Sequence, residues 1–524
     1  MLGNTKRIER NWTKLLLPLI IAAGAALRLP SILAGPQRRV GLCLADDAFY
    51  YFQIARNIVN GVGPTFDGSV ATNGFHPVYM ALLLPLFAIW PEGGDAPVRA
   101  AMLLLAAAWL ATAVPLYLIG RELCGRAAGL FAALMFCLSP YTAVISGMGV
   151  ESPLAVLVMA WAAYWQLTRV RAQPDAPLKR VVVLGALLGL AMLCRTDSGL
   201  ICVVLGLDLL WSMRSRPTRA LRNALVCAAT AGLVFAPWPL WSYIVLGHAG
   251  QDSGSALLVL TRHELANSGM EVGSYATLKL REALNMHLLR FLGFSTRAQA
   301  LGLWGVLAVA AIVARIVRGP SGRAPGRGAF IFVGALAIWL FYAAIFWSQR
   351  FWYHGHTLFA LSLLLGLLAC RMRDLFSARR TSAALVLIAV LLAGWTPTAL
   401  AIWKNGVQPW QSRYYQAAQD LGADRIEGVD PHEPLGAFNS GIYAYVSGRE
   451  VVNLDGVVNR EARDALAQGR LDQYLRQRRI DLIIDHAELI QSFGDRCQQG
   501  WSGLRVIKKY GDVFLVRLNQ ENRQ

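Results

Sequence analysis

The residues with the clearest chemical potential are Asp46 and Asp47, two adjacent carboxylates that follow the first long apolar stretch of the chain. Neighbouring carboxylates repel each other and lose solvation near lipid, so their pKa values should rise. Such a pair suits a general base, a metal ligand or a clamp for a cation. The alternative is that both side chains cap the helix expected after them, since carboxylates favour helix N-termini. We favour catalysis, and capping is compatible with it.

Arg195 and Asp197 interrupt an otherwise apolar stretch that runs from residue 181 to residue 211. The break should leave two short helices that meet at one membrane surface, where helix ends and an arginine suit a phosphate. A structural Arg–Asp pair is the alternative. Glu151 lies between two apolar blocks, and acids at membrane depth are functional candidates by default. We expect Glu151 and Asp197 to contact a substrate, although an acid shortly before Pro153 is also a common helix start.

A second polar junction is the segment from Ser348 to His356. Arg350 is a strong candidate for binding a phosphate, and His356 is a second one. Tyr353 and His354 could contact phosphate or sugar. Two histidines alone do not make a metal site, and aromatic belts at membrane interfaces explain the tyrosine and tryptophan without any function.

The composition is that of a polytopic membrane protein, because 55% of the 524 residues are hydrophobic and only 16% are charged. Soluble domains carry roughly 25% charged residues. The net charge of +18 lies entirely in the first 402 residues, because residues 403–524 hold 16 basic and 16 acidic side chains. The basic residues occupy short loops between apolar blocks, which is typical of membrane orientation and argues against nucleic acid as a partner.

We expect about 11 crossings and one half-span in residues 1–402, with the N-terminus in the cytoplasm. The first stretch is interpreted as a retained helix and not as a cleaved signal peptide. Residues 75–90 form the half-span, because they are too short for a straight crossing and contain Pro85. The expected crossings are 14–34, 97–119, 126–145, 151–168, 181–194, 197–212, 222–246, 298–314, 328–347, 356–370 and 381–402.

Alternation then places the acidic pair, Glu151, the break at Arg195, Arg350 and the tail outside the cytoplasm. Residues 403–524 predict a small α/β domain, in which short apolar strands alternate with helical patterns. The tail has no glycine-rich phosphate loop, so we do not expect nucleotide binding. Its Asn453–Asn459 segment fits turn chemistry better than a ligand site. Cys43 and Cys497 could form a disulfide or remain two free thiols.

The first loop carries a motif made of an acidic pair, a tyrosine, a basic residue and a His-Pro step that opens an apolar block: Asp46-Asp47-x-x-Tyr50, Ile54-Ala55-Arg56 and His76-Pro77. This motif resembles the first extracytoplasmic loop of the GT-C glycosyltransferases, a superfamily that includes protein O-mannosyltransferases and the bacterial aminoarabinose transferase. The resemblance covers the layout of the whole membrane part, whereas the motif itself covers about 35 residues.

The resemblance implies an α-helical GT-C-like membrane fold and transfer of a sugar from a polyprenyl phosphate outside the cytoplasm. Asp46 aligns with the family's base. Asp47 would then orient the acceptor or bind a divalent cation, Mg²⁺ or Mn²⁺. Tyr50 and His76 become candidates for substrate contact. Arg56 could reach the donor phosphate, with an interfacial anchor as an equal alternative.

We therefore predict a glycosyltransferase of the bacterial inner membrane that acts on a glycan, lipid or protein acceptor of the cell envelope. A transporter or flippase of lipid-linked sugars is the alternative. Transporters favour repeated halves and polar residues at mid-bilayer, whereas this chain shows no repeat and its polar groups gather at one face. An enzyme-like scaffold whose tail binds a partner is a third interpretation.

Overall fold

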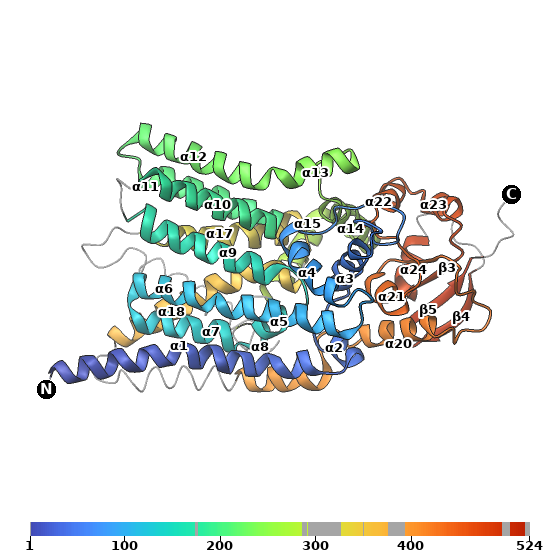
Figure 1. Cartoon of the computed structure of the whole chain (residues 1–524), viewed down its shortest axis with the longest axis horizontal. Helices are drawn as coiled ribbons and strands as arrows, with labels where there is room; N and C mark the ends of the chain where they lie inside the picture. Colours follow the sequence, from blue (N-terminus) through green and yellow to red (C-terminus); the bar gives the residue numbers. More distant parts are fainter. Residues whose placement is uncertain are drawn as a thin grey trace.

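The computed structural model describes residues 2–172, 177–285, 291, 326–348, 350–375, 394–494 and 504–518. A bundle of helices forms one end of the molecule and a small sheet with short helices forms the other (Figure 1). The helices of the first part are α1 (Leu2–Leu33), α2 (Pro36–Leu42), α3 (Asp46–Val59), α4 (Pro77–Ile89), α5 (Asp95–Ala111), α6 (Ala113–Cys124), α7 (Arg126–Leu138), α8 (Pro140–Gly147), α9 (Ser152–Trp165), α10 (Leu178–Cys194), α11 (Gly199–Ser212), α12 (Pro217–Phe235), α13 (Pro237–Leu246), α14 (Asp252–Ser268), α15 (Val272–Ala283), α17 (Ala329–Leu340) and α18 (Gly355–Leu375).

Three helices in the described ranges are long and apolar enough to cross a membrane, namely Leu15–Leu33, Asp95–Cys124 and Phe351–Cys370. The number rises to 5 if two bent pairs each count as one span. Both bends, α7 to α8 at 58° and α12 to α13 at 40°, occur where a proline begins the second helix. The expected 11 crossings are therefore not confirmed.

The difference arises because several predicted crossings fold into helices shorter than the ~20 residues a straight span needs. Helices α10 and α11, for example, have 17 and 14 residues and are separated by the break at Arg195. The predicted crossing 298–314 and most of 381–402 lie outside the described residues. The predicted half-span is the 13-residue apolar helix α4.

Close packing in the bundle depends on small residues. Helices α6 and α7 pack where Gly120 faces Gly129, and a Cβ added at Gly120 would lie 2.7 Å from the Cα of Gly129. Small residues at such positions let two helix backbones approach within a membrane.

The C-terminal part holds a five-stranded sheet in the order β2-β1-β3-β5-β4. Strands β2, β1 and β3 are parallel, and β5 and β4 continue the sheet antiparallel. The positive φ of Gly511 allows the two-residue turn between β4 and β5. The elements of this part are α20 (Gln411–Gly422), β1 (Leu435–Ala437), α21 (Gly441–Ser447), β2 (Val451–Asn453), α22 (Arg460–Ala467), α23 (Leu471–Gln477), β3 (Leu482–His486), α24 (Ala487–Gly494), β4 (Arg505–Tyr510) and β5 (Val513–Arg517).

The tail packs directly on the first loop, with α20 against α2 and α21 against α3 (Figure 1). One buried apolar cluster runs through both parts, and the ring of Tyr445 contacts those of Phe49 and Phe52 at centroid distances of 5.5 and 6.0 Å. The boundary predicted at residue 402 remains a prediction. Cys43 is a buried free thiol against the carbonyl of Gly147, and Cys497 lies outside the described residues.

Candidate active site

Asp46 caps a helix of the tail rather than its own helix. Helix α3 begins at Asp46, but its N-cap residue, Ala45, offers no side-chain cap. The carboxylate of Asp46 instead accepts hydrogen bonds from the backbone N–H of Ile442 at 2.7 Å and of Gly441 at 3.2 Å. Burial raises the pKa of Asp46 to about 8, against the opposing effect of the Ile442 hydrogen bond. Both oxygens of this carboxylate are thus engaged at the start of α21.

Asp47 has a different environment one residue further on. Its side chain keeps partial exposure. Within the described ranges its carboxylate makes no ion pair closer than 4 Å and no hydrogen bond to another residue. Burial raises the pKa of Asp47, although the nearby positive charge of Arg350 acts in the opposite direction. Asp47 is therefore the member of the acidic pair that is open to a substrate.

Arg350, from the junction between α17 and α18, supplies the positive charge beside Asp47. Its side chain is exposed, and it has no ion pair within 4 Å in the described part of the chain. The carboxylate of Asp47 raises the pKa of Arg350, with smaller effects from Tyr353 and Asp455, and burial opposes them. A guanidinium that is near carboxylates but not bonded to them can still bind an anion.

The ring of Tyr353 stacks on that of Tyr342 at 4.3 Å. The guanidinium of Arg195 lies 5.0 Å from the centre of the Tyr353 ring. His354 is buried and meets the edge of Tyr342 at 5.9 Å. His356 is also buried, and its Nε2 has no hydrogen-bond partner within the described residues. These side chains connect the Arg350 segment to the break at Arg195.

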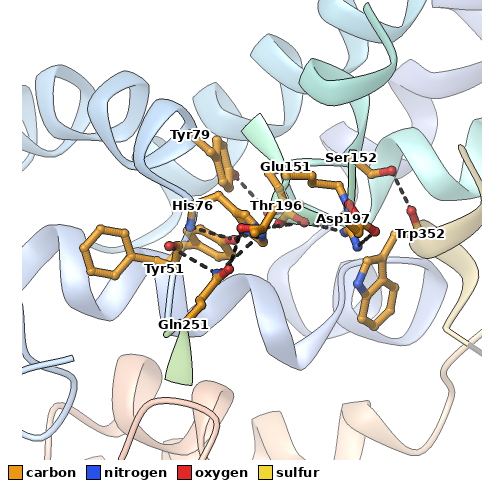
Figure 2. Close-up of polar contacts among 12 residues, drawn as sticks. Tyr51, His76, Tyr79, Glu151, Ser152, Thr196, Asp197, Gln251 and Trp352 are labelled. Atoms are coloured by element: carbon orange, nitrogen blue, oxygen red, sulfur yellow. Dashed lines mark hydrogen bonds and ion pairs between the residues drawn. The ribbon is translucent and has the colours of Figure 1, made fainter. Parts of the chain in front are cut away.

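Glu151, Arg195 and Asp197 form one buried ionic cluster, part of which is drawn in Figure 2. Arg195 donates from Nη1 to Glu151 at 2.6 Å and from Nη2 to Asp197 at 2.7 Å. Its Nε donates to Asp197 as well, and its Nη2 also reaches the hydroxyl of Tyr342 at 3.0 Å. The N–H groups of Arg195 thus donate to other groups of the protein. This arrangement matches the structural Arg–Asp pair considered above, with Glu151 as a further partner.

The cluster extends to the first loop through Tyr51 and His76 (Figure 2). The hydroxyl of Tyr51 donates to Glu151 at 2.8 Å and lies 2.7 Å from Nδ1 of His76. Nε2 of His76 is 3.4 Å from the amide nitrogen of Gln251, whose oxygen accepts from Thr196 at 2.7 Å. The break after α10, the His-Pro step and the long loop after α13 are thereby held together.

Tyr50 and Arg56 both dock the tail. The Tyr50 hydroxyl donates to the carbonyl of Phe438 at 3.2 Å and accepts from the N–H of Ser440 at 3.3 Å. The guanidinium of Arg56 donates to the Tyr445 carbonyl at 3.3 Å and lies 5.0 Å from the centre of its ring. Neither contact concerns a substrate, so the predicted substrate and phosphate roles of these two residues gain no support from the geometry.

Four polar residues near the site were not predicted as site residues from the sequence: Tyr51, Gln251, Tyr342 and Asp455. Tyr51 follows Asp47 by four residues and so lies on the same helix face, a signal that could have identified it. Tyr342 sits inside an apolar block and carries no such signal. Asp455 belongs to a segment that we assigned to turns.

A divalent cation finds few ligands in the described part of the chain. No group of three or more His, Cys, Asp or Glu side chains there is arranged to hold a metal ion. Asp46, one of the two expected ligands, has both oxygens on backbone N–H groups. That Asp46 and Asp47 hold Mg²⁺ or Mn²⁺ stays a prediction, and no step below uses a cation.

The sequence matches two family models. Residues 76–241 match the family described as dolichyl-phosphate-mannose-protein mannosyltransferase. This range includes His76, Glu151, Arg195 and Asp197 but not the acidic pair. Residues 400–520 match a domain of unknown function. No curated protein sequence matches the chain.

Solved structures of two proteins resemble nearly the whole chain. ArnT from Cupriavidus metallidurans, bound to undecaprenyl phosphate, has a TM-score of 0.57 at 14% identity, over 96% of this chain and 98% of that one. The oligosaccharyltransferase AglB from Archaeoglobus fulgidus, in complex with an inhibitory peptide and a dolichol-phosphate, has a TM-score of 0.55 at 13% identity, over 98% and 75%. The predicted resemblance to the GT-C glycosyltransferases is thereby confirmed at the level of the fold.

Proposed function

We propose that this chain, which shares the GT-C fold, is an integral membrane glycosyltransferase that moves a sugar from a polyprenyl phosphate to an acceptor outside the cytoplasm. The observation that carries the proposal is the proximity of Asp47 and Arg350, two side chains from distant segments whose charges shift each other's pKa and that both keep accessible surface. A base and an anion-binding cation are the two groups that such a transfer requires.

Asp47 is the better candidate for the base. Asp46, the residue favoured from the sequence, has both oxygens on the backbone of α21, so that abstracting a proton would compete with the docking of the tail. The Asp47 carboxylate has no such engagement in the described ranges. The raised pKa of Asp47 makes it a stronger base than an ordinary aspartate.

In the proposed reaction, the oxygen or nitrogen of an acceptor hydroxyl or amine attacks the anomeric carbon of the donor sugar. Asp47 accepts the proton that this group loses. The bond between this carbon and the phosphate oxygen breaks, and its electron pair leaves with the phosphate. Polyprenyl phosphate is the second product. Arg350 stabilises the charge that develops on the leaving oxygen, because a preorganised cation acts where charge appears in the transition state.

Glu151, Arg195 and Asp197 serve as positioning residues in this scheme. The buried cluster holds the break between α10 and α11 against the Tyr51–His76 pair and the aromatic side of the Arg350 segment. His354 and His356 belong to the same wall. The cluster therefore holds the segments that form the site in position and does not itself bind the phosphate.

The location follows from the same proposal. We place the site and the tail at the outer face of a bacterial inner membrane, with a cell-envelope glycan, lipid or protein as acceptor. The transporter alternative gains no specific support, because the polar groups meet one another where α9 begins and α10 ends, and Asp46 contacts the tail.

The proposal is tested by incubating the purified chain with a panel of polyprenyl-phosphate sugars and cell-envelope fractions, with and without a chelator. We expect the labelled sugar to move from one donor to the acceptor fraction and polyprenyl phosphate to be released. Loss of transfer in the presence of the chelator would show that a divalent cation takes part. If no donor is consumed while the protein remains folded and binds undecaprenyl phosphate, the proposed transfer is wrong.

A further inference from the structure

The segment Asn453–Asn459 of the tail, which the sequence assigned to turns, lies against the first loop beside the acidic pair. The side-chain amide of Asn453 is 3.4 Å from the hydroxyl of Tyr50, which is three residues after Asp47 on α3. A Cβ added at Gly74 would lie 2.3 Å from the carbonyl oxygen of Val457. The segment is therefore held on both sides of Asp455 by parts of the first loop.

Most polar groups of this segment are accounted for by the turn itself. The Asn453 oxygen accepts from the N–H of Gly456 at 3.0 Å and from that of Val458 at 3.4 Å. One oxygen of Asp455 accepts from the N–H of Val457 at 2.9 Å. The side-chain amide of Asn453 also interacts with the Asp455 carboxylate, whose side chain is partly exposed. An asparagine at this position could serve the turn equally well, so the turn does not explain the charge.

Asp455 lies near enough to Asp47 and Arg350 for the three charges to influence one another. Burial raises the pKa of Asp455 to about 7, and Asp47 raises it further while Arg350 lowers it. The carboxylates of Asp455, Asp46 and Asp47, together with burial, raise the pKa of Tyr50 well above its usual value. Asp455 thus lies among the groups that would surround the donor phosphate.

The donor and the lipid product of the proposed transfer differ in charge. A sugar linked to a polyprenyl phosphate is a phosphodiester with one negative charge. The released polyprenyl phosphate is a monoester, whose second ionisation lies at roughly pH 6, so that it carries nearly two charges at neutral pH. A fixed carboxylate beside the cation that holds the phosphate repels the product more than the donor.

We propose that the tail contributes Asp455 to the active site as a specificity residue that disfavours the dianionic polyprenyl phosphate and so promotes its release. This inference rests on the proposed function, because it requires Arg350 to hold the phosphate. It also gives the C-terminal part a role in the reaction beyond packing on the first loop.

The test compares two lipid probes at pH 8 by equilibrium binding to the full chain in detergent micelles. The probes are undecaprenyl phosphate, a monoester, and undecaprenyl methyl phosphate, a phosphodiester. In Asp455→Asn the monoester should bind about tenfold more tightly and the diester about threefold more tightly than in the wild type, because the repulsion scales with ligand charge. Asp430→Asn is the matched control. Asp430 is an exposed tail aspartate whose oxygen accepts from the N–H of His432 in a similar turn. It should leave both affinities unchanged.

Arg350→Gln separates the two claims, because it should weaken both probes at least tenfold. If Arg350→Gln does so while Asp455→Asn leaves the ratio of the two affinities at its wild-type value, Asp455 has no role in the discrimination and the inference is overturned. If the wild type binds neither probe, the proposed function fails and takes this inference with it. Should Asp455→Asn not fold, Asp455→Ser provides the same comparison, since its hydroxyl can accept from the N–H of Val457.

Discussion

Asp46 and Ile442 are 396 positions apart in the chain, yet the carboxylate of one accepts a 2.7 Å hydrogen bond from the backbone of the other. The first N–H groups of a helix have no partner within the helix and must find one elsewhere. For α21 that partner is the first residue of α3. The two members of the acidic pair therefore have different roles. Asp46 binds the tail, and the carboxylate of Asp47 remains accessible near Arg350.

Removing the Asp46 carboxylate should loosen the tail. Asp46→Ala leaves two buried N–H groups without an acceptor, at a cost of about 1–3 kcal/mol. We expect a lower thermal unfolding midpoint and faster proteolysis within residues 403–524. Asp430→Ala, which removes an exposed turn aspartate of the same part, should leave both unchanged. Equal protease resistance of Asp46→Ala and the wild type would contradict the capping role.

Arg195 should matter for stability more than for phosphate binding. Arg195→Met leaves the carboxylates of Glu151 and Asp197 buried without their partner, which typically costs about 3–5 kcal/mol. The added change Glu151→Gln should recover part of the loss of thermal stability, because one uncompensated charge disappears. If Arg195→Met is as stable as the wild type but no longer binds undecaprenyl phosphate, Arg195 is a phosphate ligand and our assignment is wrong.

The pH dependence of transfer should report the ionisation of Asp47. A base must be deprotonated, so kcat/KM should rise with pH. Because burial raises the pKa of Asp47, the midpoint of this rise should lie above the usual aspartate value of about 3.9. The charge of Arg350 lowers the same pKa, so Arg350→Gln should move the midpoint to higher pH and Arg350→Lys should not. If the midpoint in Arg350→Gln equals that of the wild type, the charge of Arg350 does not act on Asp47.

The outer placement of the site can be tested with engineered thiols in a chain whose own cysteines have been replaced. Ser69→Cys, Thr196→Cys and Gln468→Cys are at exposed positions in the first loop, the break and the tail. All three should react with an impermeant maleimide in intact cells. Ser215→Cys, at an exposed position in an arginine-rich connection, should react only after permeabilisation. Labelling of any two of the first three from opposite sides would contradict the arrangement.

The sequence was most informative where chain-local patterns determine structure. The predicted alternation of short apolar strands with helices in residues 403–524 is present in the structure, since such patterns are local signals. The acidic pair, Glu151, the Arg195 break and Arg350 were also identified as candidates. The predicted 11 crossings are not confirmed, because apolar composition does not reveal where a helix such as α10 ends.

The division of roles between neighbours could not be predicted for a related reason. Asp46 and Asp47 are chemically identical, and only the docking of α21 distinguishes them. Arg195 and Arg350 both interrupt apolar stretches, but the first is bonded to Asp197 in the same break and to Glu151 at the start of α9. Asp455 looked like a turn residue because its turn bond is local, whereas its proximity to Asp47 depends on tertiary packing.

The most direct measurement of the central claim is the rate of sugar transfer from the active polyprenyl-phosphate donor in Asp47→Asn and Asp46→Asn, side by side. Removal of a general base typically costs 10²–10⁴-fold in rate. We predict a loss of at least about 100-fold in Asp47→Asn, with unchanged unfolding and no weaker binding of undecaprenyl phosphate, and a much smaller loss in Asp46→Asn. Near-normal transfer by Asp47→Asn, or a larger loss in a folded Asp46→Asn, would contradict the account.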